Sequence, residues 1–303
     1  GEESRCLAFV AGSAMTDLTE SGGKVRLHVD APLGEGVRVV PDAGQSHYLL
    51  HVMRAKAGDA VSLFNGRDGE WRARVADITK RSCVFVCEAQ IAKQSETPDI
   101  WLAFAPIKKT PADYVVQKAT ELGVRALQPV FTRRTIVTRI NEDRMRANAI
   151  EASEQSGRLT VPEIREAMTL EKLLAQWPRE RRLMFCDEAG EAPPIAEALC
   201  KLPPPLAGGG NSIEQREIEL GEGGMHQPLP HVASLRAPSR KGRGEEPWAI
   251  LTGPEGGFDP AERESIRSQP FVVPVSLGER ILRADTAVLA ALSVWQALAG
   301  DWH

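Results

Sequence analysis

The sequence lacks the features that mark membrane and disulfide-bonded proteins. No apolar run approaches the roughly 18 residues that a membrane-spanning helix needs. The five cysteines include no CxxC pair, and Cys83 and Cys87 stand four apart in an alternating apolar run that would place both on one face of a strand. We therefore expect reduced, packing cysteines in a cytoplasmic protein, with no membrane span.

Metal-ligand clusters and the common nucleotide-binding loops are also missing. His47 and His51 share one helical face, but no carboxylate or cysteine completes a ligand set, so we predict no metal. The glycine-rich segment Leu251–Phe258 (LTGPEGGF) lacks both the Lys-Ser/Thr of a phosphate-binding loop and the spacing of GxGxxG. These absences disfavour a phosphate-loop nucleotide hydrolase and a dinucleotide-binding enzyme.

The residues that are present fit an ordinary globular protein with a locally basic surface. The 303 residues are 42% hydrophobic and 26% charged, and the length suggests about two domains. The formal net charge is −4, yet residues 24–93 hold 11 basic and 8 acidic residues, and residues 108–146 hold 9 basic and 4 acidic residues. Positive charge concentrated in a negative chain favours a phosphate-binding surface slightly over chance clustering.

The first 97 residues predict an extension followed by a small β-barrel. Residues 1–23 are interpreted as a disordered extension that precedes the fold. Alternating polar and apolar residues predict short strands at 24–29, 61–64, 70–75 and 82–88. Turn residues at 65–69 predict a hairpin, and residues 46–54 predict a helix. Short strands at this spacing favour a barrel that spans residues 24–97.

Residues 98–303 alternate between predicted strands and helices. Buried strands are predicted at 100–105, 124–131, 183–186, 249–252 and 272–275. Thr110 is predicted to cap one helix in a capping box with Asp113, and Asn141 is predicted to cap another that ends at Gly157. This alternation is typical of an α/β fold with a parallel sheet covered by helices.

One stretch, residues 203–247, breaks the alternation. Its 45 residues hold 8 Gly, 7 Pro and no aromatic residue. Such a segment buries too little apolar surface to offset its conformational entropy. We interpret it as a disordered insertion between two core strands.

Two segments near the carboxyl end carry the candidate chemistry. LTGPEGGF follows the predicted strand 249–252, at the strand end where open α/β sheets bind ligands. Ser276–Ala287 (SLGERILRADTA) follows the predicted strand 272–275 and leads into a helix, capped by Asp285, that is apolar on nearly every face. Taken singly, the first segment is compatible with a structural turn. The helix is compatible with a core helix or with an oligomer interface.

Together with three other stretches, these segments resemble the RsmE family of 16S ribosomal RNA uridine-N3 methyltransferases, in the SPOUT class. The other stretches are HVMR (His51–Arg54), VVQKATELGV (Val115–Val124) and EQSGR (Glu154–Arg158). The five motifs occur in family order from about Lys24 to Trp302, apart from the insertion. The resemblance implies a PUA-like amino-terminal β-barrel that holds RNA and a carboxy-terminal SPOUT α/β domain tied in a deep trefoil knot, despite the rarity of knots.

The resemblance also implies an S-adenosylmethionine pocket shared by the two glycine-containing segments. Its implied residues are Leu251, Gly253, Glu255, Gly256, Leu277, Gly278, Ile281 and Leu282. Uridine N3 must lose a proton before it attacks, so a cation beside the ring carbonyls stabilises the developing anion. Arg283 is the candidate for that role, and Glu255 for proton acceptor or cofactor contact. The alternative for Arg283 is a salt bridge to Asp285 or Glu279 that fixes the loop.

Further implications concern RNA and a second subunit. Arg54, Arg133, Arg134 and Arg158 are candidates for phosphate contacts, which position RNA without reading its sequence. Each of them alone is also compatible with a solvated surface charge. The resemblance implies 16S ribosomal RNA, within the small ribosomal subunit, as the substrate. It also implies a homodimer with the last helix in its interface.

Two departures from the family pattern leave an alternative open. The family usually has Glu where this chain has Asp285, and the insertion at 203–247 could hinder dimer packing or access of RNA. The alternative is a non-catalytic RNA-binding or ribosome-assembly factor on the same fold, although the intact GPEGG and LGERILR segments favour an enzyme. A Rossmann-type methyltransferase is disfavoured because its glycine loop would follow the first strand of its domain.

Overall fold

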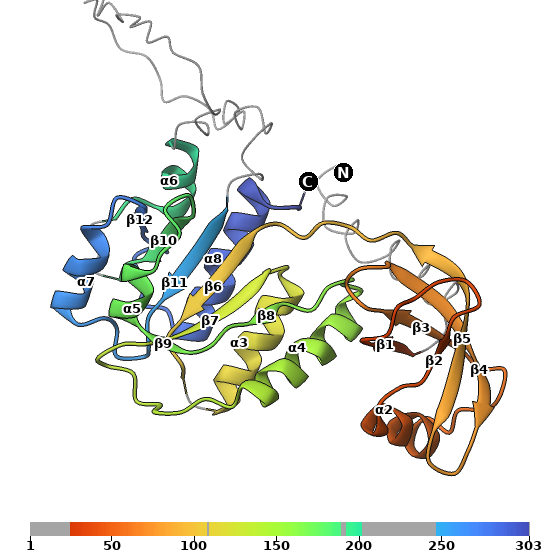
Figure 1. The fold of residues 1–303 in the computed structure, drawn as a ribbon. Helices are drawn as coiled ribbons and strands as arrows, with labels where there is room; N and C mark the ends of the chain where they lie inside the picture. Colours follow the sequence, from red (N-terminus) through yellow and green to blue (C-terminus); the bar gives the residue numbers. More distant parts are fainter. Residues whose placement is uncertain (1–24, 108, 189–191, 202–246, 303) are drawn as a thin grey trace, which may run out of the picture.

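The computed structural model describes residues 25–107, 109–188, 192–201 and 247–302. These residues form two sheets, each with its own hydrophobic core, joined by an extended segment (Figure 1). The predicted extension at 1–23 and all but the last residue of the predicted insertion at 203–247 lie outside the described residues. None of the described helices is long and apolar enough to cross a membrane.

Five strands form the amino-terminal sheet, in the order β1-β3-β4-β5-β2. Their bounds are Arg26–His28 for β1, Arg38–Val39 for β2, Ala60–Phe64 for β3, Glu70–Ile78 for β4 and Cys83–Ala92 for β5. The predicted hairpin is confirmed, since β3 and β4 pair antiparallel across Asn65–Gly69. Within the described part of the chain no pairing joins the edge strands β1 and β2, so closure into a barrel stays a prediction.

Alternation along β5 fixes which side chains enter the core of this sheet. Cys83, Phe85 and Cys87 are all buried in one cluster, while the residues between them are partly exposed. The prediction that the two cysteines share a strand face is therefore confirmed. Burial raises the pKa of both thiols, which makes them poor nucleophiles.

The helix predicted at 46–54 begins earlier in the structure. The helix α2 (Ala43–His47) continues directly into the π-helical turn η1 (Tyr48–Val52). The Asp42 carboxylate accepts a hydrogen bond from the Gln45 main-chain N–H, and the Gln45 side chain accepts one from the Asp42 N–H. This capping box satisfies the main-chain amides of Asp42 and Gln45 and starts the helix after Asp42, so the predicted start at residue 46 was wrong.

Seven parallel strands form the second sheet, in the order β12-β10-β11-β6-β7-β8, with β9 also pairing β7. Their bounds are Ile100–Phe104 for β6, Ala126–Phe131 for β7, Glu163–Ile164 for β8, Met168–Thr169 for β9, Arg182–Cys186 for β10, Trp248–Thr252 for β11 and Val272–Val275 for β12. The predicted parallel sheet is thus confirmed. The two-residue strands were not predicted because they are too short to show a periodic pattern.

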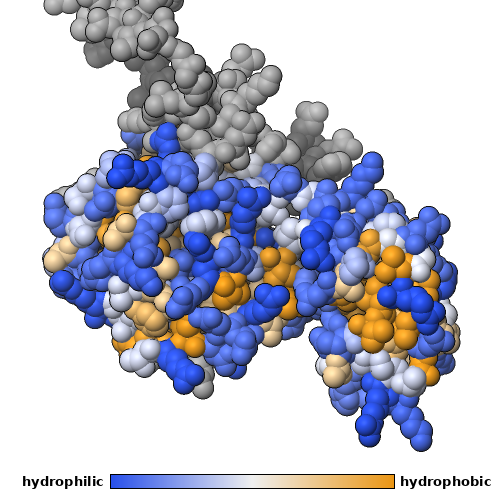
Figure 2. Space-filling model, viewed as in Figure 1, coloured by the Kyte–Doolittle hydropathy of each residue, from blue (hydrophilic) through white to orange (hydrophobic). Residues whose placement is uncertain are grey.

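Helices cover both faces of this sheet (Figure 1). One face packs against α3 (Lys109–Glu121), α4 (Glu142–Ser156), α6 (Ile195–Lys201) and α8 (Ala284–Ala299), and the other against α5 (Leu170–Ala175) and α7 (Pro260–Arg267). The visible surface is mostly hydrophilic, with hydrophobic residues gathered on the part of the molecule that holds the smaller sheet (Figure 2).

Helix caps in the carboxy-terminal part were predicted with mixed success. Asn141 caps α4, and Gly157 ends it in a left-handed conformation, as predicted. The cap predicted at Thr110 is wrong, because α3 already begins at Lys109. The Asp113 carboxylate accepts hydrogen bonds from two side chains of α4, those of Arg144 and Asn148.

The last helix, α8, begins two residues earlier than predicted. Its N-cap is Arg283, whose side chain makes no capping hydrogen bond, and Asp285 lies inside the first turn. The Asp285 carboxylate accepts a hydrogen bond from the Thr286 N–H, so the predicted capping role of Asp285 is wrong. One face of α8 is buried against the sheet, including Trp295, while other apolar residues stay partly exposed.

Arg158 is built into the fold. Its guanidinium donates hydrogen bonds to the carbonyl oxygens of Thr120 and Val124, and to the hydroxyl of Thr160. Burial lowers the pKa of Arg158 to about 10. Because the last carbonyls of a helix lack partners within it, Arg158 caps the carboxyl end of α3.

We predict that Arg158→Ala lowers the free energy of unfolding by about 1–3 kcal/mol, because it removes the guanidinium hydrogen bonds to the carbonyl oxygens of Thr120 and Val124. Urea unfolding measures the loss. The matched control is Arg139→Ala, which removes the same charge from an exposed position and is expected to change stability by less than about 0.5 kcal/mol. Unchanged stability of the Arg158 variant, combined with weaker RNA binding, would contradict this structural role.

Candidate functional site

The two predicted glycine loops leave the same edge of the seven-stranded sheet. Strand β10 lies between β11 and β12, and all three run parallel. Phe185 is in register with Leu251, and Cys186 with Val275, so the three strands end side by side. The loops that follow β11 and β12 therefore flank the loop that follows β10, at the carboxyl edge where open α/β sheets bind ligands.

The first loop, residues 253–258, depends on two glycines for its own packing. A Cβ atom on Gly253 would lie 2.7 Å from the ring of the buried Phe258. Gly257 has φ +66°, and a Cβ atom there would lie 2.0 Å from Oε1 of Glu188. The Glu188 carboxylate also accepts a hydrogen bond from the Phe258 N–H, at 3.2 Å. These two glycines therefore fix the loop against the strand ends.

The rest of the first loop faces outward. Glu255 and Gly256 are exposed, and a Cβ atom on Gly256 would lie 3.7 Å from the Arg134 side chain, its one close neighbour in the described part of the chain. Leu251 was predicted to line the pocket, but its side chain is fully buried in the core. Its side chain therefore supports the loop from beneath, and its contact with the cofactor stays a prediction.

Arg133 and Arg134, predicted as phosphate contacts, lie beside this loop. Arg134 Nη1 donates to the Gly256 carbonyl oxygen at 2.9 Å, and Arg133 Nη1 pairs with Asp259 at 3.0 Å. Both side chains are exposed at the end of β7. Asp259 is the N-cap of α7 in a capping box with Glu262, whose carboxylate also accepts from the Arg133 main-chain N–H. The end of β7 thus holds both the loop and the helix that follows it.

The second loop, residues 276–283, presents an open surface. Gly278 has φ +107°, and no atom of another described residue beyond its chain neighbours lies within 4 Å of a Cβ atom built there. Leu277 packs against the core, Leu282 is half-buried, and Ile281 is 93% exposed. An apolar side chain left so uncovered beside an open glycine fits an apolar ligand that the main chain approaches closely.

The charged groups at this edge differ in their exposure to solvent. Arg283 is exposed at the start of α8 and forms no ion pair with any residue that the structure describes, so the alternative salt bridge to Asp285 or Glu279 is absent. Asp187, after β10, is instead fully buried and binds Arg263 and Arg267 of α7. The buried carboxylate anchors α7, and the exposed guanidinium remains available to a ligand.

Sequence reasoning missed Asp187 and Glu188, which organise this edge. The signal in the sequence is their position, because two carboxylates directly follow a buried parallel strand.

The two remaining arginines that were predicted to contact phosphates, Arg54 and Arg158, do not lie at this edge of the sheet. Arg54 is exposed in the smaller sheet's part of the chain, with φ +53°, and the donors of Arg158 are engaged within the fold. The structure therefore brings Arg133, Arg134 and Arg283 to the sheet edge but not Arg54 or Arg158.

Comparisons with known proteins agree with this architecture. The family described as RNA methyltransferase domain matches residues 94–207 and 224–296, and the family described as RNA methyltransferase PUA domain matches residues 40–87. The first of these matches alone spans more than half of the chain.

Sequence similarity to individual proteins extends over most of the chain. The ribosomal RNA small subunit methyltransferase E of Rickettsia conorii is 29% identical over 88% of this chain and 93% of its own length. The protein of the same name from Synechocystis is 28% identical over 84% of this chain and 71% of its own. A crystal structure of a ribosomal RNA small subunit methyltransferase E from Neisseria gonorrhoeae, bound to S-adenosyl methionine, is 26% identical with a TM-score of 0.68, covering 92% of this chain and 99% of that one. The chain belongs to the RNA methyltransferase family whose methyltransferase domain is preceded by a PUA domain.

Proposed function

We propose that this protein transfers a methyl group from S-adenosylmethionine to N3 of a uridine in 16S ribosomal RNA. The observation that carries the proposal is the meeting of two glycine loops at one edge of the parallel sheet in a member of the RNA methyltransferase family. The names of the similar proteins, and the S-adenosyl methionine bound to one of them, support the choice of RNA and of cofactor.

The described residues fit this cofactor. The open space at Gly278 and the uncovered side chain of Ile281 suit an adenine ring, which needs an apolar slot with main-chain partners. The other proposed contacts are Gly253, Glu255, Gly256, Leu277 and Leu282. The cofactor supplies an activated methyl group, so the main task of the protein is to orient it towards the base nitrogen. Glu188 and Arg134 keep the first loop in place for that task.

Two charged side chains at this edge are proposed to act on the uridine. Arg283 places its guanidinium beside the ring carbonyls and stabilises the negative charge that develops when N3 loses its proton. Glu255, exposed on the first loop, accepts that proton or contacts the cofactor. Both are exposed, as groups that meet a large substrate must be.

RNA is proposed to bind across exposed arginines. Arg54 lies with the smaller sheet, whereas Arg133 and Arg134 lie beside the first loop. Their free donors suit phosphate oxygens, which position a strand without reading its bases. Arg158 is left out, because its donors serve main-chain oxygens within the fold.

The finer architecture is proposed on the family likeness. We assign residues 24–97 to a PUA-like barrel and residues 98–303 to a SPOUT domain with a deep trefoil knot. A homodimer through α8 is supported by the partly exposed Leu289, Val294 and Leu298 on a helix whose other face is core. The substrate is proposed to be the small ribosomal subunit in the cytoplasm, at the decoding-region uridine.

The function is tested by incubating the protein with S-adenosylmethionine and either free 16S ribosomal RNA or small subunits from a strain that lacks the activity. Mass spectrometry of RNase fragments is expected to find N3-methyluridine at a single position. Cofactor binding without any methyl transfer would instead favour a non-catalytic RNA-binding or ribosome-assembly factor.

Gly256→Val is predicted to weaken S-adenosylmethionine binding at least about tenfold, because two methyl groups would project from the open face of the first loop. Isothermal titration calorimetry measures the affinity. Gly34→Val, in a loop of the smaller sheet, is the matched control and should bind normally. Wild-type affinity in the Gly256 variant would refute the assignment of this loop.

Arg283→Ala is predicted to reduce kcat about 100-fold while cofactor affinity changes less than about twofold, because the guanidinium acts on charge that develops during the reaction. The control is Arg280→Ala, an equally exposed arginine of the same loop. Equal losses in turnover and in cofactor affinity would assign Arg283 to binding.

A further inference from the structure

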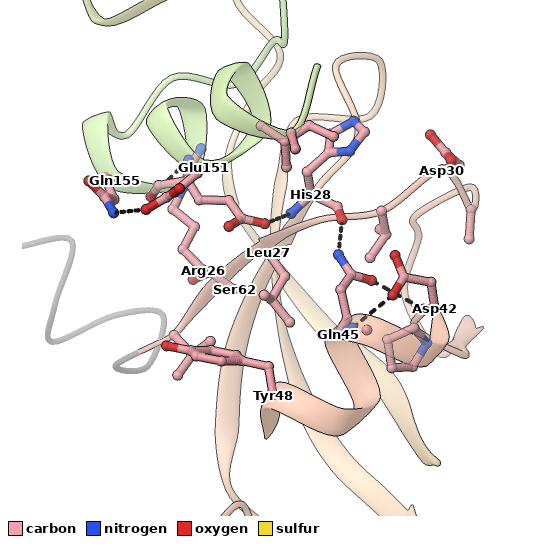
Figure 3. A pocket seen from close by; sticks show the side chains of 18 of the residues that line it. Arg26, Leu27, His28, Asp30, Asp42, Gln45, Tyr48, Ser62, Glu151 and Gln155 are labelled. Carbon is pink, nitrogen blue, oxygen red and sulfur yellow. Dashed lines mark hydrogen bonds between the residues drawn. The ribbon is translucent and has the colours of Figure 1, made fainter. Parts of the chain in front are cut away.

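Among the described helices and strands, β1 and α4 form the main contact between the two parts of the molecule. Strand β1 of the smaller sheet lies against the carboxyl end of α4, which belongs to the larger sheet's helical layer. A groove of about 1220 Å³ opens beside this contact and separates the neighbouring surfaces (Figure 3). The residues at this contact therefore contribute to the relative placement of the two parts.

Arg26 of β1 caps the carboxyl end of α4. Its Nη1 donates to the Ser153 carbonyl oxygen, and its Nη2 donates to the Arg158 carbonyl oxygen at 2.6 Å. Carbonyl groups in the last turn of a helix lack partners within the helix and carry partial negative charge. A guanidinium from the other part of the molecule supplies both the missing donors and the matching charge.

The Arg26 side chain is held in position from its own sheet. Its Nε pairs with Glu70 Oε1 at 3.0 Å, and its guanidinium carbon lies 3.9 Å from the centre of the Phe64 ring. The Arg26 and Glu70 side chains are only 15% and 4% exposed. A cation fixed in this way is directed at α4 before the two parts meet, which reduces the entropy lost in the contact.

A reciprocal contact runs from the helix to the strand. The Glu154 carboxylate accepts a hydrogen bond from the His28 main-chain N–H at 2.9 Å, and the His28 carbonyl oxygen accepts one from Gln45 at 2.6 Å (Figure 3). Burial raises the pKa of the Glu154 carboxyl, in line with its removal from water at this contact. Arg26 and His28 are two apart on β1 and so share one face of the strand.

The helix side of the contact is anchored firmly. Met145 and Ala149 of α4 are buried in the core of the larger sheet, and Arg158 ties the following segment to α3. The EQSGR segment, Glu154–Arg158, was expected to contribute a phosphate contact. In the structure it supplies a carboxylate and main-chain oxygens that receive β1.

We propose that Arg26 and Glu154 form an interdomain latch that sets the smaller sheet, and the RNA it holds, against the methyl-transfer edge of the larger sheet. This inference rests on the proposed function. Arg26 is a positioning residue, because it touches neither cofactor nor uridine. When the latch opens, the smaller sheet holds bound RNA less closely to the site, and the effective concentration of the target base falls.

The test uses the full-length protein with Arg26→Ala and Glu154→Ala. Small-angle X-ray scattering is expected to show a larger radius of gyration than for the wild type. The KM for ribosomal RNA should rise about tenfold, with kcat at saturating RNA and cofactor affinity unchanged within about twofold. Glu154→Gln keeps an acceptor oxygen for the His28 N–H and should restore both properties.

Matched controls separate the latch from general loss of charge. Arg38→Ala removes an exposed arginine from the same sheet, and Glu151→Ala removes an exposed carboxylate one turn earlier on α4. Both should behave like the wild type. Since Arg26→Ala leaves Glu70 buried without its partner, the double variant Arg26→Ala/Glu70→Gln is measured alongside it. Glu154→Ala opens the latch without touching that pair.

Unchanged scattering in Glu154→Ala and in the double variant would overturn the latch. Altered scattering with an unchanged KM for RNA would overturn its positioning role. A wild-type protein that transfers no methyl group would refute the proposed function, yet the scattering series would still report on the contact between the two parts.

Discussion

The structure depends above all on the parallel pairing of β10 between β11 and β12. Parallel strands must be joined by crossovers, so each strand ends at the same edge and sends its loop into the same space. Residues far apart in the sequence, Glu188 and Phe258 among them, become partners there. Without this pairing, the two glycine loops would be ordinary turns on separate parts of the surface.

Polar contacts to helix ends organise the molecule in a consistent way. Arg158 caps α3, Arg26 caps α4, and Asp259 begins α7 beside the first glycine loop. In each case a charged side chain satisfies main-chain groups that helix geometry leaves unpaired. Such contacts are directional, so they fix where a helix end lies more tightly than apolar packing does. This explains how a modest set of side chains positions the site and the smaller sheet.

The sequence predicted those features that depend on local pattern. The hairpin at Asn65–Gly69, the cap at Asn141 and the strands of the parallel sheet all have signals within a few residues, and the structure contains them. Predictions failed where a distant partner decides. The Asp113 carboxylate is bound by side chains of α4, and Arg158 is half-buried, with its donors on main-chain oxygens, although its charge suggested a surface. Sequence shows the charge of a side chain but not the carbonyl groups that will surround it.

The central claim is that the loops after β11 and β12 together hold one methyl donor. Hydrogen–deuterium exchange with and without S-adenosylmethionine tests it most directly, because bound main-chain amides exchange more slowly. We expect protection to appear in residues 253–258 and 276–283 together. Protection in only one of these loops, or confined to the groove between β1 and α4, would contradict it.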